Sequence, residues 1–475
     1  MSEVTAIVCV YFILITAVAV IIGRRMNNSV AFFGNNLSVA MCVAIGAGEW
    51  MGGTSTTGVS EYGYKYGISG AWYTIANGIG ILVLALFFAR MFRRTGITTV
   101  SGIIGKYIGV KAGKVSGILI LITLFAVGTS QMIALGTLGE TLFHTSTAIS
   151  ILVGGTFVVL YTGIGGNIVI AKTNLIHIVV LVVGMTITAL VSVRQLGWNM
   201  IATQLPASYF SMDSIGIPKV VSWIIASVLG ACTAQAGLQP ILCAKNEKVA
   251  VKASMIIAFI VAPLGIITAL LGMVGRIWYP NLENPKLVLP MLLTSLNPVM
   301  STIMMIALFS AVISTASPII LSCGTIIIKD MLTDIINFEK FDEGRRILFS
   351  RGATAISGLI CMILAISLAS GNTILDIVYF AYSIRGSLFI ILLMGIINRR
   401  INELDAIIAM LMTATVSVFW IIYKTVTGNY PIHPFFSETY IAVLAALVSS
   451  IFLRFVRNKH GEHSRVCGEK GRRNA

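Results

Sequence analysis

Charged side chains are scarce in this chain. Its 475 residues include 18 acidic and 33 basic ones, so only 11% are charged, whereas about a quarter are charged in an ordinary soluble domain. This scarcity excludes a soluble globular protein. The seven cysteines have no paired spacing such as C-x-x-C, so they specify neither a disulfide framework nor a zinc site. Neither H-E-x-x-H nor G-x-S-x-G is present, and no motif supports an enzyme.

Hydrophobic residues, in contrast, make up 57% of the chain, which is about 270 residues. At roughly 20 residues per bilayer crossing, they suffice for about thirteen transmembrane helices. We therefore predict an all-α polytopic membrane protein with little room for a separate soluble domain. The predicted spans are 4–22, 37–60, 68–90, 115–143, 146–165, 167–192, 217–242, 251–277, 298–328, 351–370, 373–397, 404–423 and 436–456.

The basic residues predict the orientation of these spans. Arg24 and Arg25 follow the first apolar run instead of preceding it, which is the reverse of a signal peptide. A retained first helix with its N-terminus outside puts 26 of the 33 Lys and Arg residues on the cytoplasmic side, six outside and one, Arg385, within a span. The positive-inside rule favours this arrangement, with a cytoplasmic C-terminus. The net charge of +15 therefore indicates orientation in the inner (plasma) membrane, with lipid and not nucleic acid as partner.

The spans divide into two sets of five. Without the first helix and the last two, ten remain, and because five is odd the second set crosses the membrane in the opposite direction to the first. This pattern predicts an inverted repeat. The predicted segments are an extra helix and loop (1–36), the first repeat (37–192), an outer loop (193–216), the second repeat (217–397), two C-terminal helices (398–456) and a basic cytoplasmic tail (457–475).

The opening helix of each repeat contains an interruption. Residues 46–58 read GAGEWMGGTSTTG, and residues 230–240 read GACTAQAGLQP. Matched glycine-interrupted helices that open two repeats indicate the binding site of a transporter. The alternative is close helix packing, because Gly48 and Gly52 form a G-x-x-x-G motif. Glu49 beside these glycines favours an unwound helix, since close packing does not require a carboxylate.

At these residues the chain resembles the sodium/solute symporter family over essentially its whole length. The segments 48–67 (GEWMGGTSTTGVSEYGYKYG) and 310–331 (SAVISTASPIILSCGTIIIKDM) are similar to the first and eighth core helices of that family. The resemblance implies a LeuT-like five-plus-five fold, sodium as the coupling ion, and a small solute such as a sugar, an amino acid or an organic acid. Two positions depart from the family pattern, Ser317 and the TNLIH sequence at 173–177.

Three residues of the eighth core helix are candidate sodium ligands. Ala311, Ser314 and Thr315 have i, i+3, i+4 spacing and share one helical face. Pro318 lacks an N–H group, so the Ser314 carbonyl loses its helical partner and becomes available to a hard cation. The alternative is that the hydroxyls bond back to their own helix. The resemblance implies that the carbonyls of Ala47 and Trp50 complete the sodium site.

Two ionisable residues lie within predicted spans. An ionised Glu49 near mid-bilayer costs at least about 2.5 kcal/mol, so it must be protonated, paired with a cation or exposed to water. A structural partnership with a helix end is the alternative. Arg385 lies about twelve residues from either end of its span. We consider three roles for it equally: neutralising Glu49, binding a substrate carboxylate, or capping carbonyls of a broken helix.

The remaining candidates for solute binding or coupling are uncharged: Gly53, Thr54, Gln131, Gln235 and Tyr382. For Gln131, as for His177, an ordinary interhelical hydrogen bond is the favoured interpretation, and for Tyr382 ordinary packing is an equal one. We predict a sodium-coupled importer of a small polar organic solute, without an organic cofactor. The alternatives are a proton-coupled transporter of the same fold and an ion channel, and the oligomeric state stays open.

Overall fold

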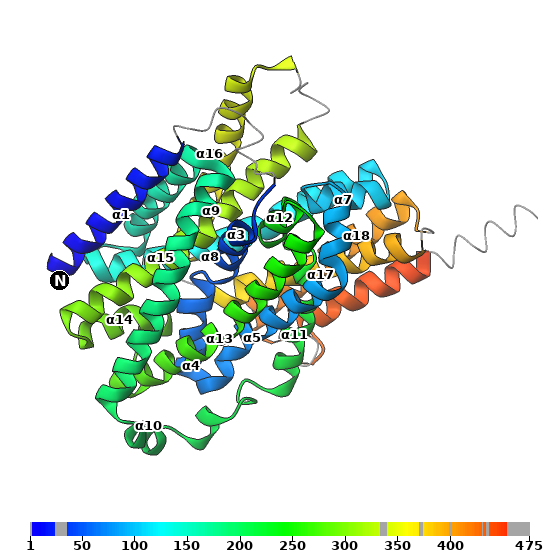
Figure 1. The fold of residues 1–475 in the computed structure, drawn as a ribbon. Coiled ribbons are helices and arrows are strands. Elements are labelled where there is room, and N and C mark those ends of the chain that lie inside the picture. Colours follow the sequence, from blue (N-terminus) through cyan, green and yellow to red (C-terminus); the bar gives the residue numbers. More distant parts are fainter. Residues whose placement is uncertain are drawn as a thin grey trace, which may run out of the picture.

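The computed structural model describes residues 2–23, 36–332, 340–369, 374–398, 401–429, 431–433 and 437–453. In these residues the only β-type pairing is an isolated bridge between Leu37 and Ala244, and helices make up the fold (Figure 1). Arg24, Arg25, Arg399, Arg400 and the predicted tail at 457–475 lie outside the described residues.

The helices follow one another along the chain, joined by short connections. They are α1 (Ser2–Gly23), α3 (Val39–Trp50), η1 (Thr54–Gly58), α4 (Val59–Tyr66), η2 (Gly67–Ala71), α5 (Trp72–Val83), η3 (Leu84–Phe88), α6 (Ala89–Arg94), α7 (Val100–Tyr107), α8 (Val110–Phe143), α9 (Thr147–Leu196), α10 (Trp198–Gln204), η4 (Ala207–Phe210), α11 (Ile217–Ala231), α12 (Gln235–Leu242), α13 (Glu247–Trp278), η5 (Pro285–Leu287), α14 (Val288–Ser295), α15 (Pro298–Ile326), η6 (Ile327–Met331), α16 (Glu343–Leu368), α17 (Ile374–Asn398) and α18 (Glu403–Thr427), followed by a short apolar helix at Glu438–Leu453.

Nine helices among the described residues are long and apolar enough to cross a membrane, or ten if α11 and α12 form one bent span. The difference from thirteen arises partly because α9 contains two predicted spans. A straight helix of 50 residues would be about 75 Å long, well over twice the hydrocarbon thickness. Gly166, with φ 54° and ψ −164°, breaks α9 between them. The chain is thus a multi-pass membrane protein, and the count of thirteen stays a prediction.

Both predicted interruptions are breaks in the structure. In the first set, α3 ends at Trp50, and helical structure resumes at Thr54 as the π-helical turn η1. In the second set, α11 ends at Ala231 and α12 begins at Gln235, with a bend of 40° between them. Pro240 lies inside α12 and does not form the break. The helices α3 and α12 lie next to each other near the middle of the bundle (Figure 1).

At one end of the molecule, the segments that are predicted to lie outside the cell contact one another. The hydroxyl of Tyr209 donates to the Tyr64 carbonyl at 2.9 Å. The hydroxyl of Tyr64 accepts hydrogen bonds from Arg276 Nη1 at 3.1 Å and from the Leu282 N–H at 3.0 Å. These contacts join the predicted outer segments at 61–67, 193–216 and 278–297.

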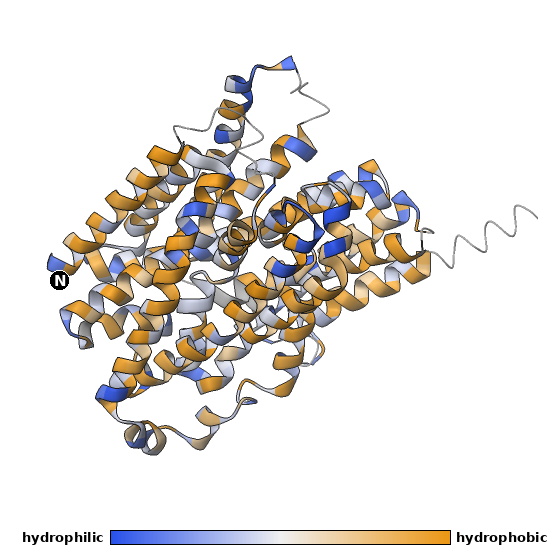
Figure 2. Ribbon diagram, viewed as in Figure 1, coloured by the Kyte–Doolittle hydropathy of each residue, from blue (hydrophilic) through white to orange (hydrophobic). Residues whose placement is uncertain are grey.

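Segments predicted to be cytoplasmic meet at the opposite end. Arg94 Nε pairs with Glu247 Oε1 at 2.8 Å, and Thr99 Oγ1 donates to Asp330 Oδ1 at 3.1 Å. Figure 1 shows α7 and α10 at opposite ends of the bundle, and Figure 2 shows hydrophobic residues along the helices between them. This grouping suits alternating spans, but which end faces the cytoplasm stays a prediction.

Candidate functional site

The break in the first core helix lies against α15 because glycines permit the approach. A Cβ atom on Gly48 would lie 3.0 Å from the Ser314 carbonyl oxygen, and one on Gly52 would lie 2.3 Å from Thr315 Oγ1. The hydroxyl of Thr315 donates to the Gly48 carbonyl across this contact. Close packing and unwinding, which were alternatives at the sequence level, therefore occur together here.

The side chains of Ser314 and Asn174 complete the polar contacts on this face of α15. Ser314 Oγ donates to the Ala311 carbonyl at 3.0 Å and lies 3.5 Å from the Gly48 carbonyl oxygen. The Ser314 carbonyl, released by Pro318, accepts a hydrogen bond from Asn174 Nδ2 at 2.9 Å. The Ser314 hydroxyl thus bonds back to its own helix and the Thr315 hydroxyl reaches the broken first core helix, while their role as sodium ligands stays a prediction.

The predicted carbonyl ligands of the broken helix are engaged locally. The Ala47 carbonyl accepts a hydrogen bond from the Met51 N–H at 3.0 Å, and the Trp50 carbonyl accepts one from Ser55 Oγ at 2.5 Å. In this structure the carbonyl that meets α15 belongs to Gly48, which sequence reasoning did not select. Glycine patterns identify the break but do not indicate which carbonyl turns toward the partner helix.

Glu49 is buried beside the second broken helix. It is only 5% exposed, and its Oε2 atom has no hydrogen-bond partner among the residues that the structure describes. Gly237 of α12 makes room for this carboxylate, because a Cβ atom there would lie 2.9 Å from Glu49 Oε2. The carboxylate thus lies where α3 meets α12, which are in the opening helices of the two predicted repeats.

Arg385 of α17 brings a positive charge to the same region. It is 1% exposed, and its charge acts electrostatically on Glu49. Within the described part of the chain, its Nη2 atom has no hydrogen-bond partner. The guanidinium lies over the ring of Tyr382 at 5.3 Å, and Nε is 3.5 Å from Thr123 Oγ1. The Arg385 carbonyl accepts a hydrogen bond from Thr233, in the break between α11 and α12, at 2.7 Å.

Three aromatic rings pack together beside Arg385. Tyr382 packs edge-on against Trp50, with 6.3 Å between ring centroids, and stacks with Tyr73 at 6.4 Å. The hydroxyl of Tyr73 lies 3.4 Å from that of Tyr382 and donates to Thr54 Oγ1 at 3.2 Å. Sequence reasoning missed Tyr73, because a tyrosine in an apolar helix carries no signal of which neighbours it faces.

The two candidate glutamines have different surroundings. Gln131 Oε1 accepts a hydrogen bond from the Gly53 N–H at 2.7 Å, which satisfies a backbone donor freed by the break. This confirms the interhelical hydrogen bond expected for Gln131. Gln235 Oε1 accepts a hydrogen bond from the Val100 N–H at 2.8 Å, and its Nε2 donates to the Thr98 carbonyl at 3.2 Å.

His177 makes the interhelical hydrogen bond expected from its isolated position. Its Nδ1 atom lies 2.7 Å from the hydroxyl of Tyr11 in α1, and that hydroxyl also contacts Ser310 Oγ of α15 at 2.6 Å. The described residues contain no group of three or more His, Cys, Asp and Glu side chains suited to a metal ion.

Two broken helices that meet beside buried charges within a polytopic bundle define a secondary active transporter. The chain belongs to the sodium:solute symporter family, whose sequence profile matches residues 32–413. It is therefore a transporter and not an enzyme, and the family pairs sodium with a small-molecule solute.

Curated relatives are similar at low identity. The human high affinity choline transporter 1 is 24% identical over 304 residues, which cover 59% of this chain and 52% of the relative. The symporter YwcA of Bacillus subtilis (strain 168) is 23% identical over 353 residues, covering 69% of this chain and 67% of YwcA. The chain thus spans about half the length of the first relative and two thirds of the second.

Solved structures share the fold. A Na⁺-coupled sialic acid symporter in a substrate-bound outward-open state has a TM-score of 0.79 at 16% identity, with 95% of this chain and 97% of the other covered. MhsT in complex with L-phenylalanine has a TM-score of 0.57 at 16% identity, with 89% and 99% covered. The fold is therefore that of LeuT-like transporters.

Proposed function

We propose that the protein imports a small zwitterionic solute, such as an amino acid, together with sodium across the plasma membrane by alternating access. The observation that carries this proposal is the pair of buried, unpartnered atoms of opposite charge, Glu49 Oε2 and Arg385 Nη2. An isolated charge at this depth is costly, and a ligand with an ammonium and a carboxylate group satisfies both. Trp50, Tyr73 and Tyr382 enclose its remaining surface.

Sodium binds, in this proposal, between the broken first helix and α15. Thr315 and Ser314 supply hydroxyl oxygens, and Ala311, Ala47 and Trp50 supply carbonyls. The Gly48 carbonyl, which now accepts the hydrogen bond from Thr315, is an additional ligand. Sodium then links α15 to the same helix that carries Glu49, so ion and solute stabilise one arrangement of the break.

A second candidate solute is an organic cation. Aromatic rings and a carboxylate together suit a quaternary ammonium group, and a relative is named as a choline transporter. Arg385, which lies 5.3 Å from the centroid of the Tyr382 ring, places a second positive charge at the site. Repulsion by this charge favours the zwitterion over the cation.

The test is a binding screen of the purified protein with four matched solute classes: zwitterions, monocarboxylates, quaternary amines and neutral sugars. Thermal shift is measured in sodium and in N-methylglucamine buffers. We expect stabilisation by zwitterions in sodium only. Stabilisation by quaternary amines alone would support the second candidate, and stabilisation by sugars alone would contradict a role for both charges in solute binding.

Coupling is tested in proteoliposomes with a solute found in that screen. An inward sodium gradient should drive accumulation, and by linkage the solute should tighten sodium binding by the same factor as sodium tightens solute binding. Accumulation driven by a proton gradient alone would instead support proton coupling. Uptake that does not saturate and has no fixed ion-to-solute ratio would indicate a channel.

A further inference from the structure

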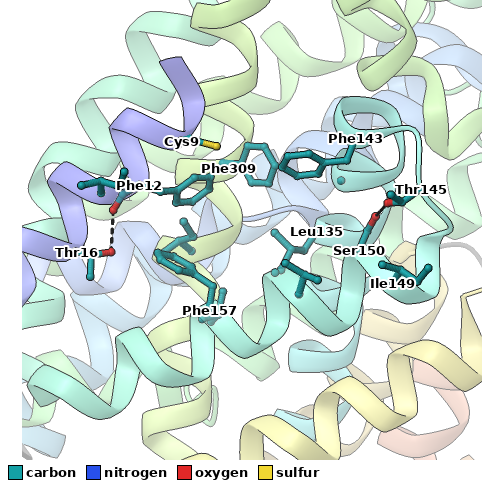
Figure 3. Close-up of a pocket in the computed structure, with 16 residues that line it drawn as sticks. Cys9, Phe12, Thr16, Leu135, Phe143, Thr145, Ile149, Ser150, Phe157 and Phe309 are labelled. Carbon is teal, nitrogen blue, oxygen red and sulfur yellow. Dashed lines mark hydrogen bonds between the residues drawn. The ribbon is translucent and has the colours of Figure 1, made fainter. Parts of the chain in front are cut away.

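A large apolar groove lies between α1 and the hairpin formed by α8 and the first half of α9 (Figure 3). Its volume is about 750 Å³. Phe12 of α1 reaches into it and packs edge-on against Phe157 of α9 at 5.0 Å and Phe309 of α15 at 5.1 Å. The groove is separate from the region around Glu49 and Arg385, neither of which lines it.

The hydroxyl groups that line this groove already have hydrogen-bond partners within the protein. Thr16 Oγ1 donates to the Phe12 carbonyl at 2.7 Å, and Thr145 Oγ1 and Ser150 Oγ bond to each other at 2.9 Å (Figure 3). A polar ligand would lose its hydrogen bonds to water here without gaining replacements, which is costly. The occupant must therefore be hydrocarbon.

The rim of the groove opens toward the bilayer. Ile13 of α1 is 67% exposed and Val153 of α9 is 63% exposed, and both belong to helices apolar enough to span the membrane. Lipid tails are fluid and lie directly against these side chains, whereas an empty groove would forfeit van der Waals contacts along its walls. We propose that the groove binds an acyl chain of a membrane phospholipid.

A helix from a second copy of the chain fits this groove less well. Helices associate in lipid through small residues or polar contacts, because apolar area alone provides no driving force there. The small residues of the groove are used internally: a Cβ atom on Gly154 would lie 2.9 Å from Leu135, and one on Gly139 would lie 2.7 Å from Ser150 Cβ. The outward face of α1 presents Ile13 instead.

The bound chain would pack behind the helix that carries the candidate sodium ligands. Phe309 and Ile313 line the groove, and Ile313 directly precedes Ser314 and Thr315. Ser310, on the same helix, contacts Tyr11 of α1. An acyl chain in the groove therefore supports α15 and α1 together, on a face of α15 different from that of Thr315.

The experiment uses two tryptophan variants of the full chain. Val153→Trp fills the groove, whereas Leu152→Trp places the same side chain at a neighbouring position that is 54% exposed and does not line the groove. Native mass spectrometry after detergent exchange measures the retained phospholipid. We expect wild type and Leu152→Trp to retain one lipid, and Val153→Trp to retain at least about tenfold less.

A second measurement locates the chain directly. Phosphatidylglycerol with a diazirine in its acyl tail should label peptides of α1 and the first half of α9 above other lipid-facing helices, and Val153→Trp should remove this excess. Ile149→Phe, a milder substitution in the same groove, replaces Val153→Trp if the latter lowers the thermal stability. Equal lipid retention in all proteins, uniform labelling, or a wild-type dimer that Val153→Trp dissociates would each overturn the proposal.

Discussion

The hydroxyl of Thr315 in α15 donates a hydrogen bond to the Gly48 carbonyl of the broken first core helix. Thr315→Ala removes one proposed sodium ligand and little volume, so we expect the fold to persist. Losing one ligand should raise the sodium requirement on the order of tenfold, equivalent to about 1.4 kcal/mol. Solute affinity should recover at saturating sodium, because sodium then restores the solute-competent state.

This prediction is measured as a grid of sodium against solute concentration. Thr325→Ala is the matched control, because Thr325 is buried in the same helix and its hydroxyl bonds only to the Leu321 carbonyl, at 2.9 Å. A solute affinity that stays low at saturating sodium would move Thr315 out of the ion site, and unchanged kinetics would assign it to packing.

A substitution of Glu49 tests the proposed solute site, again at the scale of a single residue. Its Oε2 atom has no partner within the described chain, so Glu49→Gln keeps the size, removes the charge and sacrifices no hydrogen bond of that atom. We expect zwitterion affinity to fall by roughly 10- to 100-fold, as for loss of a hydrogen bond to a charged group. Monocarboxylate binding should fall less, because it depends on Arg385.

Sodium-dependent solute binding is measured for the purified Glu49→Gln protein, with Glu140→Gln as the control. Glu140 lies elsewhere, at the end of α8, where its carboxylate accepts a hydrogen bond from Thr147. Wild-type affinity in Glu49→Gln would show that the carboxylate is structural. An equal loss in both variants would point to a general effect of removing an acid.

At the scale of elements, Gly166 decides that α9 consists of two segments. Its φ of 54° with ψ of −164° lies in a region that residues with a side chain avoid. Gly166→Ala should therefore cost about 1–3 kcal/mol and lower the melting temperature. Gly163→Ala is the control, because a Cβ atom there meets nothing within 4 Å. Equal melting temperatures for the two variants would contradict a strained break.

We interpret the contact between α7 and η6, the turn that follows α15, as a gate. Asp330 accepts hydrogen bonds from Ser101 Oγ at 2.6 Å and from Thr99 Oγ1 at 3.1 Å. Ser101→Ala removes one bond to a charged group, worth about 1.5–3 kcal/mol. Opening of this end should become on the order of tenfold more frequent.

Cys243 is buried near the same end of the molecule. The rate at which its thiol reacts with a reagent therefore measures how often this end opens. Its modification by a maleimide should be correspondingly faster in Ser101→Ala. Ser116→Ala provides the comparison, because that buried hydroxyl donates only to the Gly113 carbonyl of its own helix, at 2.7 Å. An unchanged rate in Ser101→Ala would mean that the Asp330 contact does not restrain the gate.

At the scale of the whole molecule, the prediction is orientation. Lys106 and Thr203 are both exposed and lie in segments predicted to be cytoplasmic and external, respectively. In intact cells, an impermeant maleimide should modify Thr203→Cys and not Lys106→Cys, in a background in which Cys9 and Cys467 are serine. Permeabilised cells should allow both reactions. The reverse pattern would invert the topology derived from the Lys and Arg distribution.

The sequence alone determined the class of molecule and the two breaks. Composition excluded a soluble fold, and long apolar runs required helices, because a helix satisfies its own backbone hydrogen bonds in lipid. Glycine-rich segments at 46–58 and 230–240 located the interruptions, since local backbone freedom is encoded in the residues themselves. Glu49 and Arg385 stood out because charges are rare inside spans.

Only the tertiary structure decided which atoms meet. Spacing placed Ser314 and Thr315 on one face of a helix, but the close approach at Gly48 and Gly52 selected the Gly48 carbonyl as the partner of Thr315. Asn174, which is far away in the chain, donates to the Ser314 carbonyl, and the side chain of Gln235 accepts a hydrogen bond from the Val100 N–H of α7. The groove beside α1 likewise depends on three segments distant in sequence, namely α1, the hairpin of α8 and α9, and α15. Such contacts depend on how helices pack, and periodicity within one helix does not specify its neighbours.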